Sequence, residues 1–148
     1  IVDVKSFVSN DYWKHDVEDN AYALMRSTTG VVAMLHSTAT QWRHRFNLEV
    51  TLEKGAIVLS GILSGSKSYG SETMTVVWAG EDDDGDPREE TTQYDHDPSW
   101  ADEINAFATA ISNGSPIANG SSTDALKTME LVYRIYRSDP EWAGRWNL

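Results

Sequence analysis

The sequence predicts an α+β fold: an open, predominantly antiparallel sheet with two C-terminal helices packed on one face. Up to residue 98, apolar and polar residues alternate in short segments, a pattern typical of strands with one covered face. Short turns that contain glycine separate several of these segments. After residue 98, apolar residues recur every three or four positions, which indicates amphipathic helices.

The strand pattern is clearest at residues 45–53, where Phe46, Leu48, Val50 and Leu52 alternate with polar residues. We expect these strands to form one sheet. The predicted strands cover residues 1–8, 21–27, 31–39, 45–53, 56–63, 73–79 and 91–95.

Two helices are predicted after the strands, each with a start signal and a stop signal. Residues 99–102 (Ser-Trp-Ala-Asp) fit a capping box, and Asn113-Gly114 ends this helix. Residues 121–124 start the second helix in the same way, and Pro140 ends it because proline cannot continue a helix. Hairpin-linked strands followed by a helical pair are typical of α+β domains.

The two helices are expected to leave the opposite face of the sheet uncovered. Residues 56–63 and 73–79 carry apolar residues on both sides of the strand, so this face cannot be fully polar. Large exposed apolar patches are rare in monomers. We therefore expect a homo-oligomer, at least a dimer, paired through this open sheet face.

The composition narrows the possible partners. The chain has 148 residues, about one domain, and no apolar run reaches the roughly 18 residues that cross a bilayer. Its net charge of −11 argues against nucleic acid and anionic membranes, since phosphate binding requires concentrated lysine and arginine. Cysteine is absent, which excludes disulfides and thiolate metal sites and permits a reducing compartment. We expect a cytoplasmic protein.

A compact polar cluster lies between two predicted strands, at residues 40–45. Two guanidiniums, an imidazole, an amide and an indole occur within five residues, and function concentrates on loops held by rigid strands. The candidate substrate-binding residues are Gln41 and His44 for hydroxyls, Trp42 for a sugar face and Arg43 for a carboxylate or phosphate. The alternative is an ordinary connection whose cations pair with an acidic surface.

Other motifs argue against a metal site or a nucleotide site in this chain. The acidic loop at residues 81–86 lacks suitable calcium ligands, because Gly80 and Thr91 occupy the first and last EF-hand positions. It is better interpreted as a solvated hairpin tip. The histidines lack zinc-site spacing, and neither G-x-G-x-x-G nor a Walker motif occurs.

A series of short motifs is individually weak but specific in its order and spacing. These motifs are Val17–Ala21, Gly30, Leu35–Ser37, Gln41–His44, Leu48–Val50, Glu53–Gly55, Ser68–Gly70, Trp100–Phe107, Asn113-Gly114, Thr123–Leu126 and Ile135-Tyr136. In this order the chain resembles, over about residues 1–142, the C-terminal domain of the glucose–fructose oxidoreductase/inositol dehydrogenase/MocA (Gfo/Idh/MocA) family.

This resemblance implies a two-domain oxidoreductase. Its N-terminal Rossmann domain would bind NAD or NADP, and this domain would form an open sheet beside a sugar, cyclitol or nucleotide sugar. The family's Glu-Lys-Pro motif and its Gly-Gly, Asp and His signature do not occur here. Glu53-Lys54-Gly55 lies in a predicted hairpin turn and is not equivalent to that lysine motif. No catalytic role is therefore carried onto this chain.

We accordingly expect residues 1–148 to be the C-terminal substrate and oligomerisation domain of a longer protein. Its partners would be a Rossmann domain preceding Ile1, a sugar-like small molecule and a second copy. This chain alone is expected to be inactive and to bind no cofactor. The competing hypothesis is a non-enzymatic carbohydrate-binding or dimerisation module, and a G-x-G-x-x-G motif upstream would decide for the enzyme.

Overall fold

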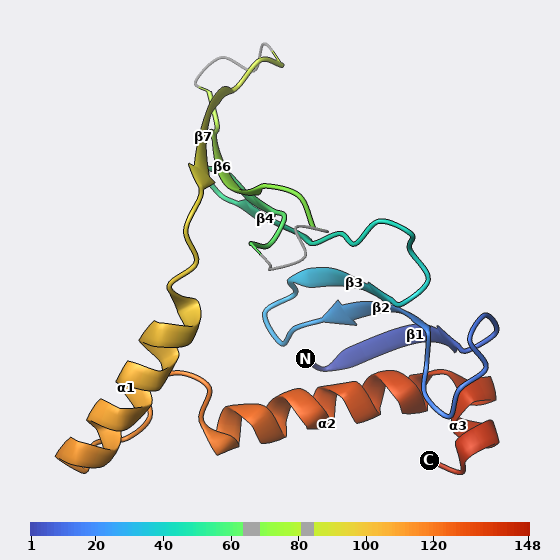
Figure 1. The fold of residues 1–148 in the computed structure, drawn as a ribbon. Coiled ribbons are helices and arrows are strands. Elements are labelled where there is room, and N and C mark those ends of the chain that lie inside the picture. The colour runs from blue at the N-terminus through green and yellow to red at the C-terminus, as the bar shows by residue number, and fades with distance from the viewer. Residues whose placement is uncertain (64–68, 81–84) are drawn as a thin grey trace. The chain divides into compact units, whose positions relative to one another are not determined.

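The computed structural model describes residues 1–63, 69–80 and 85–148. In these residues, antiparallel strands precede three helices (Figure 1), which confirms the predicted α+β class. The strands are β1 (Asp3–Ser9), β2 (Asn20–Arg26), β3 (Val32–Thr38), β4 (Asn47–Leu52), β5 (Gly55–Ser60), β6 (Glu72–Trp78) and β7 (Arg88–Tyr94). The helices are α1 (Ser99–Asn113), α2 (Ser122–Ser138) and α3 (Pro140–Trp146).

The strands form two sheets instead of the single sheet expected. One has the order β1-β2-β3 and the other the order β4-β5-β6-β7. β3 and β4 are both edge strands, and residues 39–46 connect them along the chain. Chain contacts divide in the same way: unit 1 comprises Ile1–Thr40 with Asn113–Leu148, and unit 2 comprises Gln41–Ser112.

In unit 1, α2 and α3 pack on β1, so two C-terminal helices cover one face of this sheet (Figure 1). That face carries the buried residues Ser6, Ala21 and Ala23, which the strand register brings together. The Ser6 hydroxyl donates a 2.5 Å hydrogen bond to the carbonyl oxygen of Ile135 in α2. Ile135 and Trp142 supply larger buried apolar side chains from the helices.

The opposite face of this sheet is apolar and exposed. Phe7 and Met34 lie on it with 79% and 81% of their surfaces exposed, beside the exposed Leu24. Tyr22 and His36 stack across the strands, with ring centroids 4.1 Å apart and planes inclined by 12°. Unit 1 therefore has one face covered by helices and one apolar face open.

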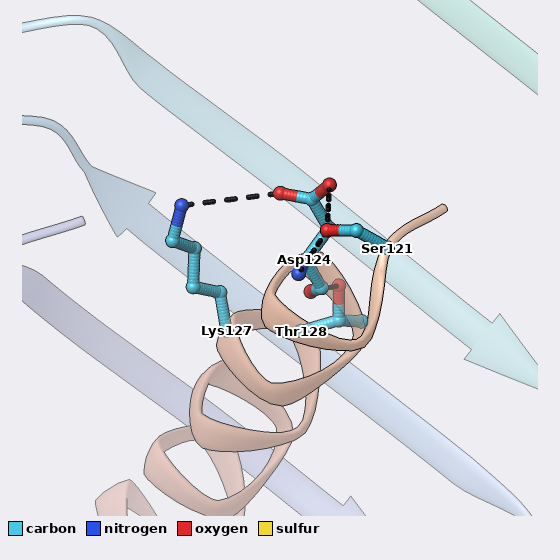
Figure 2. Close-up of polar contacts among 4 residues, drawn as sticks. All are labelled: Ser121, Asp124, Lys127 and Thr128. Carbon is cyan, nitrogen blue, oxygen red and sulfur yellow. Dashed lines mark hydrogen bonds and ion pairs between the residues drawn. The ribbon is translucent and has the colours of Figure 1, made fainter. Parts of the chain in front are cut away.

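α2 begins as the sequence predicts (Figure 2). The Ser121 hydroxyl accepts a 3.2 Å hydrogen bond from the Asp124 amide and donates a 2.7 Å bond to its carboxylate. Lys127 Nζ lies 3.9 Å from the same carboxylate, and the Thr128 hydroxyl donates to the Asp124 carbonyl. The bond to the Asp124 amide satisfies a backbone donor that the first turn leaves without a helical partner.

The end of α2 is also the beginning of a helix that was not predicted. Pro140 ends α2, as expected, but it also occupies the first turn of α3, where proline's missing amide costs nothing. The Asp139 carboxylate accepts hydrogen bonds from the amides of Glu141 and Trp142 at 2.9 and 3.1 Å. It also accepts a 2.7 Å bond from the Val8 amide, so the cap of α3 ties this helix to β1.

In unit 2, the predicted hairpin between β4 and β5 is present. Gly55 has a φ of +149°, and a Cβ at this position would overlap with the carbonyl oxygen of Val77, so only glycine fits. Glycine is therefore required at this position of the turn, because the backbone of β6 lies too close to admit a side chain.

The four-stranded sheet of unit 2 has one apolar and one mainly polar face. The paired residues Leu48, Leu59 and Met74 share the apolar face, because paired residues of antiparallel strands point the same way. The remaining apolar side chains on this face are Val50, Leu52, Ile57, Val76 and Trp78. Among the described residues of unit 2, only Gly61 and Ala110 are buried, so this apolar face remains substantially exposed.

Helix α1 also has an open apolar side. Trp100, Ile104, Phe107 and Ile111 are all exposed and recur at helical spacing.

No helix in the described part of the chain combines the length and apolarity that a membrane span requires. Glu81–Asp84, most of the predicted acidic hairpin tip, and Ser68 of the Ser68–Gly70 motif lie outside the described residues.

Candidate functional site

The predicted substrate-binding residues Gln41, Trp42, Arg43 and His44 lie in the connection between β3 and β4, at the start of unit 2. All four are exposed, and Trp42 exposes 95% of its surface. The connection runs into β4, an edge strand. The cluster is therefore accessible to a ligand.

One of these side chains contacts a distant segment. The His44 ring lies 5.1 Å from the Tyr69 ring, centroid to centroid, with the planes inclined by 52°. Tyr69 belongs to the Ser68–Gly70 motif, so this contact brings two of the sequence motifs together. These four residues do not line the hollow of unit 2, which includes Leu59 and Met74.

A hollow of about 410 Å³ lies within unit 2, at the end of the sheet's apolar face. Leu59 and Met74 contribute apolar side chains from paired positions of β5 and β6. Glu72 and Tyr94 are paired across β6 and β7, and the hollow also reaches the start of α1. The lining residues are Phe46, Leu59, Gly61, Ile62, Leu63, Glu72, Thr73, Met74, Tyr94, Asp97 and Ser99.

Two carboxylates at the hollow are held by backbone amides. Glu72 Oε2 accepts a 2.8 Å hydrogen bond from the Leu63 amide. Asp97 Oδ1 accepts a 3.0 Å hydrogen bond from the Ser99 amide, so Asp97 caps the start of α1 from two residues before it. Each carboxylate retains capacity to accept further hydrogen bonds, since an ionised carboxylate has about four acceptor positions.

The environment of Asp97 favours its charged form. The Ser99 side chain and the Ser99 amide donate hydrogen bonds to the carboxylate, and the charge of His96 acts in the same direction, so the pKa of Asp97 lies below its ordinary value of 3.8. Asp97 is therefore an anion at neutral pH. It can accept protons in hydrogen bonds from a ligand, but it is poorly suited to donate one.

A close backbone approach forms one wall of the hollow. Gly61 has a φ of +74°, and a Cβ there would overlap with the carbonyl oxygen of Ser71. The Gly61 amide donates a 3.0 Å hydrogen bond to the Phe46 carbonyl. Glycine at this position therefore lets the ends of β5 and β6 come together beside Phe46.

Sequence reasoning missed Glu72, Tyr94 and Asp97 as residues of a common site. Asp97 could have been noticed, because an aspartate before Pro98-Ser99 is a helix-start signal. The proximity of Glu72 and Tyr94 depends on the register of β6 and β7, which no local motif specifies. Among the residues that the structure describes, no group of three or more His, Cys, Asp or Glu side chains could hold a metal ion.

A second polar cluster, in unit 1, organises the β1–β2 connection. Asp19 Oδ2 accepts 2.9 Å hydrogen bonds from the amides of Tyr12 and Trp13. Burial raises the pKa of Asp19, but these bonds and one from Asn20 outweigh burial and leave the pKa below 3.8. Asn10 is also buried and accepts a 2.6 Å bond from Arg145. Groups of the protein itself already donate hydrogen bonds to the buried side-chain oxygens of Asp19 and Asn10. We therefore assign this cluster to the fold and not to ligand binding.

Comparisons with models of protein families, with curated proteins and with solved structures found no match to this chain. The resemblance described above therefore depends on the sequence motifs. Two of these motifs, which lie at opposite ends of the chain, meet in unit 1: the Tyr136 hydroxyl donates a 2.8 Å hydrogen bond to Glu18 Oε2.

Proposed function

We propose that this chain is the substrate-binding and oligomerisation domain of an NAD(P)-dependent oxidoreductase that acts on a sugar, cyclitol or nucleotide-sugar hydroxyl or carbonyl. A Rossmann domain of the same protein would bind NAD or NADP and supply the catalytic groups. This chain would orient the substrate. The location that we propose for the whole protein is the cytoplasm.

One observation carries the proposal more than any other: a sheet with a broad exposed apolar face next to an exposed polar segment. The apolar face of β4–β7 has exposed Leu48, Val50 and Leu52, and exposed apolar surface of this extent is characteristic of interaction surfaces. Gln41–His44 lies immediately before β4 on the chain. This combination suits a domain that contacts other protein domains while presenting polar groups to a substrate.

The motif residues support the proposal through the parts they play in the fold. Asp19 organises a loop, Gly55 forms a turn that only glycine fits, and Glu18 accepts a hydrogen bond from Tyr136. Residues with such defined structural parts are those that related domains would share. The substrate and the cofactor in this proposal depend on the resemblance.

The chemistry of hydride transfer assigns a limited task to this domain. A nicotinamide held by the Rossmann domain would accept the hydride from a hydroxyl-bearing carbon or donate it to a carbonyl, and protein groups would position the substrate carbon. Arg43 would pair with a carboxylate or phosphate, Gln41 and His44 would hydrogen-bond to hydroxyls, and Trp42 would pack on a sugar face. A second copy would cover the apolar sheet face.

The test is an activity assay of the whole gene product. It would be incubated with NAD or NADP and a panel that contains glucose, myo-inositol and UDP-glucose, and formation of the reduced cofactor would be followed by absorbance. The proposal predicts reduction with at least one member of the panel. A whole gene product without a nucleotide-binding domain, or without activity on any member, would contradict it.

An alternative function is a non-enzymatic carbohydrate-binding or dimerisation module. The observation that favours it is the highly exposed indole of Trp42, since exposed aromatic rings can pack on sugars. Saturable sugar binding by a gene product that does not bind NAD or NADP would support this alternative.

A further inference from the structure

The chain contains the tripeptide Asn-Gly-Ser twice, at residues 113–115 and 119–121, and asparagine precedes glycine nowhere else in its sequence. Both asparagines are exposed. The glycine after each has a positive φ, +61° at Gly114 and +68° at Gly120. Because the two tripeptides are identical, a difference in the chemistry of Asn113 and Asn119 would reflect the structure around each of them.

An asparagine that is followed by glycine can lose ammonia without an enzyme. The backbone nitrogen of the glycine attacks Cγ of the asparagine, so that a bond from Cγ to the backbone nitrogen forms and the Cγ–Nδ2 bond breaks. The proton of the glycine amide leaves with Nδ2 as ammonia, and water then opens the five-membered imide to aspartate or isoaspartate. No group is oxidised or reduced, and water is the only co-reactant. Glycine favours the attack because it has no Cβ to obstruct the approach to its nitrogen.

The two asparagines differ in secondary structure. Asn113 is the last residue of α1, whereas Asn119 lies in the connection between α1 and α2, outside the helices and strands. Ring closure turns the next backbone nitrogen towards the asparagine Cβ, a geometry that the helical backbone does not provide. The last turn of α1 must therefore open before Asn113 can react, but no such opening is needed at Asn119.

Access to the reacting nitrogen does not distinguish the two sites. A Cβ at Gly114 or at Gly120 would meet no other group within 4 Å, so both glycines lie in open surroundings. The difference that remains between the two tripeptides is the helix that ends at Asn113.

We propose that Asn119 is a site of spontaneous deamidation and that α1 protects Asn113 from the same reaction. The inference goes beyond the proposed function, because the reaction requires only water and this segment of the chain, with no substrate, cofactor or second domain.

The reaction changes the segment that leads into α2. Asn119 lies two residues before Ser121, whose hydroxyl accepts the hydrogen bond from the Asp124 amide at the start of this helix (Figure 2). Deamidation adds a negative charge to a chain whose net charge is −11, and isoaspartate also lengthens the main chain by one carbon atom. The modified protein therefore differs from the original in charge and can be separated from it by anion exchange.

The experiment is a prolonged incubation of the 148-residue chain in neutral buffer at body temperature, followed by trypsin digestion and tandem mass spectrometry. Cleavage after Arg88 and Lys127 leaves Asn105, Asn113 and Asn119 in one peptide, so its fragment ions compare the three asparagines directly. We expect deamidation of Asn119 to be at least about 10-fold faster than that of Asn113, a ratio that corresponds to a barrier difference of about 1.4 kcal/mol. Asn105, which precedes alanine within α1, should react most slowly. Equal rates at Asn113 and Asn119, a faster reaction at Asn113, or no reaction at Asn119 would overturn the proposal.

Unfolding separates the effect of α1 from the effect of neighbouring residues. In concentrated urea the helix is lost, so Asn113 and Asn119 should react at similar rates. An undiminished difference between the two asparagines in urea would contradict protection by the helix.

A matched pair of variants tests the role of the glycine nitrogen. Gly120→Ala should slow the reaction at Asn119 by at least about 10-fold, because a methyl group obstructs the approach to the nitrogen, and should leave Asn113 unchanged. Gly114→Ala makes the same change after Asn113 and should leave the rate at Asn119 unchanged. An unchanged rate at Asn119 in Gly120→Ala, measured in urea as well as in neutral buffer, would overturn the proposed route.

Discussion

Individual side chains divide into those that hold the fold and those that are open to a ligand. Glu18, Asp19 and Asp139 accept hydrogen bonds that join segments distant in the sequence or organise a loop. Arg43 and Trp42, by contrast, are exposed on a connection between sheets. Substitutions in the first group should therefore lower the stability of the fold, and substitutions in the second group should lower the affinity for a ligand.

Arg43 tests the proposed substrate cluster. Arg43→Ala in the whole protein should raise KM or lower kcat/KM, since a cation that pairs with a substrate anion is lost. The free energy of unfolding should change by less than about 0.5 kcal/mol, as is usual for exposed residues. Arg45→Ala removes a neighbouring guanidinium and serves as the control. A large loss of stability with unchanged kinetics would assign Arg43 to the fold.

Tyr136 tests the contact between the first and last motifs. Burial, together with the hydrogen bond and charge of Glu18, raises the pKa of Tyr136 to about 12 from its ordinary value of 10.0. A raised folded-state pKa means that this stabilisation is fully present below pH 10.0 and is lost as the pH rises towards about 12. Tyr136→Phe should lower the free energy of unfolding by about 1 kcal/mol at neutral pH.

Urea unfolding at a series of pH values would measure this effect. The difference between wild type and Tyr136→Phe should shrink as the pH rises from 10.0 towards about 12. Tyr133→Phe removes an exposed hydroxyl from the same helix and is the control. A difference that stays constant over this pH range would show that the hydroxyl of Tyr136 is not the stabilising group.

At the scale of elements, local patterns predicted most strands and two helices. The alternation at residues 45–53 and the cap at Ser121 correspond closely to β4 and to the start of α2. β7 begins at Arg88, earlier than the predicted residue 91, because Arg88 pairs with Trp78 and its guanidinium lies 4.6 Å from the ring centroid. Cross-strand pairing of this kind is not visible in a local pattern.

Two features depended on information that lies outside local patterns. α3 is not predicted by the local pattern, because Pro140 indicates the end of α2, although proline also favours the first turn of a helix. The hollow was missed because Glu72 and Tyr94 come together only through strand register. The polar cluster at Gln41–His44 was found from composition, and its part in substrate binding stays a prediction.

Gly61 tests the backbone approach that forms one wall of the hollow. Gly61 and Gly70 have similar positive φ angles, +74° and +83°, but only at Gly61 would a Cβ overlap with the backbone. Gly70→Ala should lower the free energy of unfolding by about 1 kcal/mol, and Gly61→Ala by roughly 2 kcal/mol more, because of the overlap. Equal losses in chemical denaturation would mean that β5 and β6 do not approach closely there.

At the scale of the whole molecule, the exposed apolar faces predict association, because large exposed apolar patches are rare in monomers. We predict that the chain is at least a dimer, paired through the apolar face of β4–β7. The net charge of −11 opposes association only weakly at physiological salt, where screening acts over about 8 Å. Two copies related by a twofold axis would make a self-complementary contact.

Light scattering at micromolar concentration would test the dimer. A mass near 16.5 kDa, that of one chain, would contradict it. Val50→Lys, on the apolar face, should produce monomers because it places a charge in the contact. Thr51→Lys adds the same charge to the opposite face of β4 and should leave the dimer intact.

The division of tasks between this chain and a Rossmann domain is tested most directly by titrating NADH and NADPH into the isolated chain and into the whole gene product. The chain contains neither G-x-G-x-x-G nor a Walker motif, so we predict that it binds neither cofactor. The whole protein should bind at least one of them saturably. Saturable micromolar binding to the isolated chain, or no binding to the whole protein, would contradict the account.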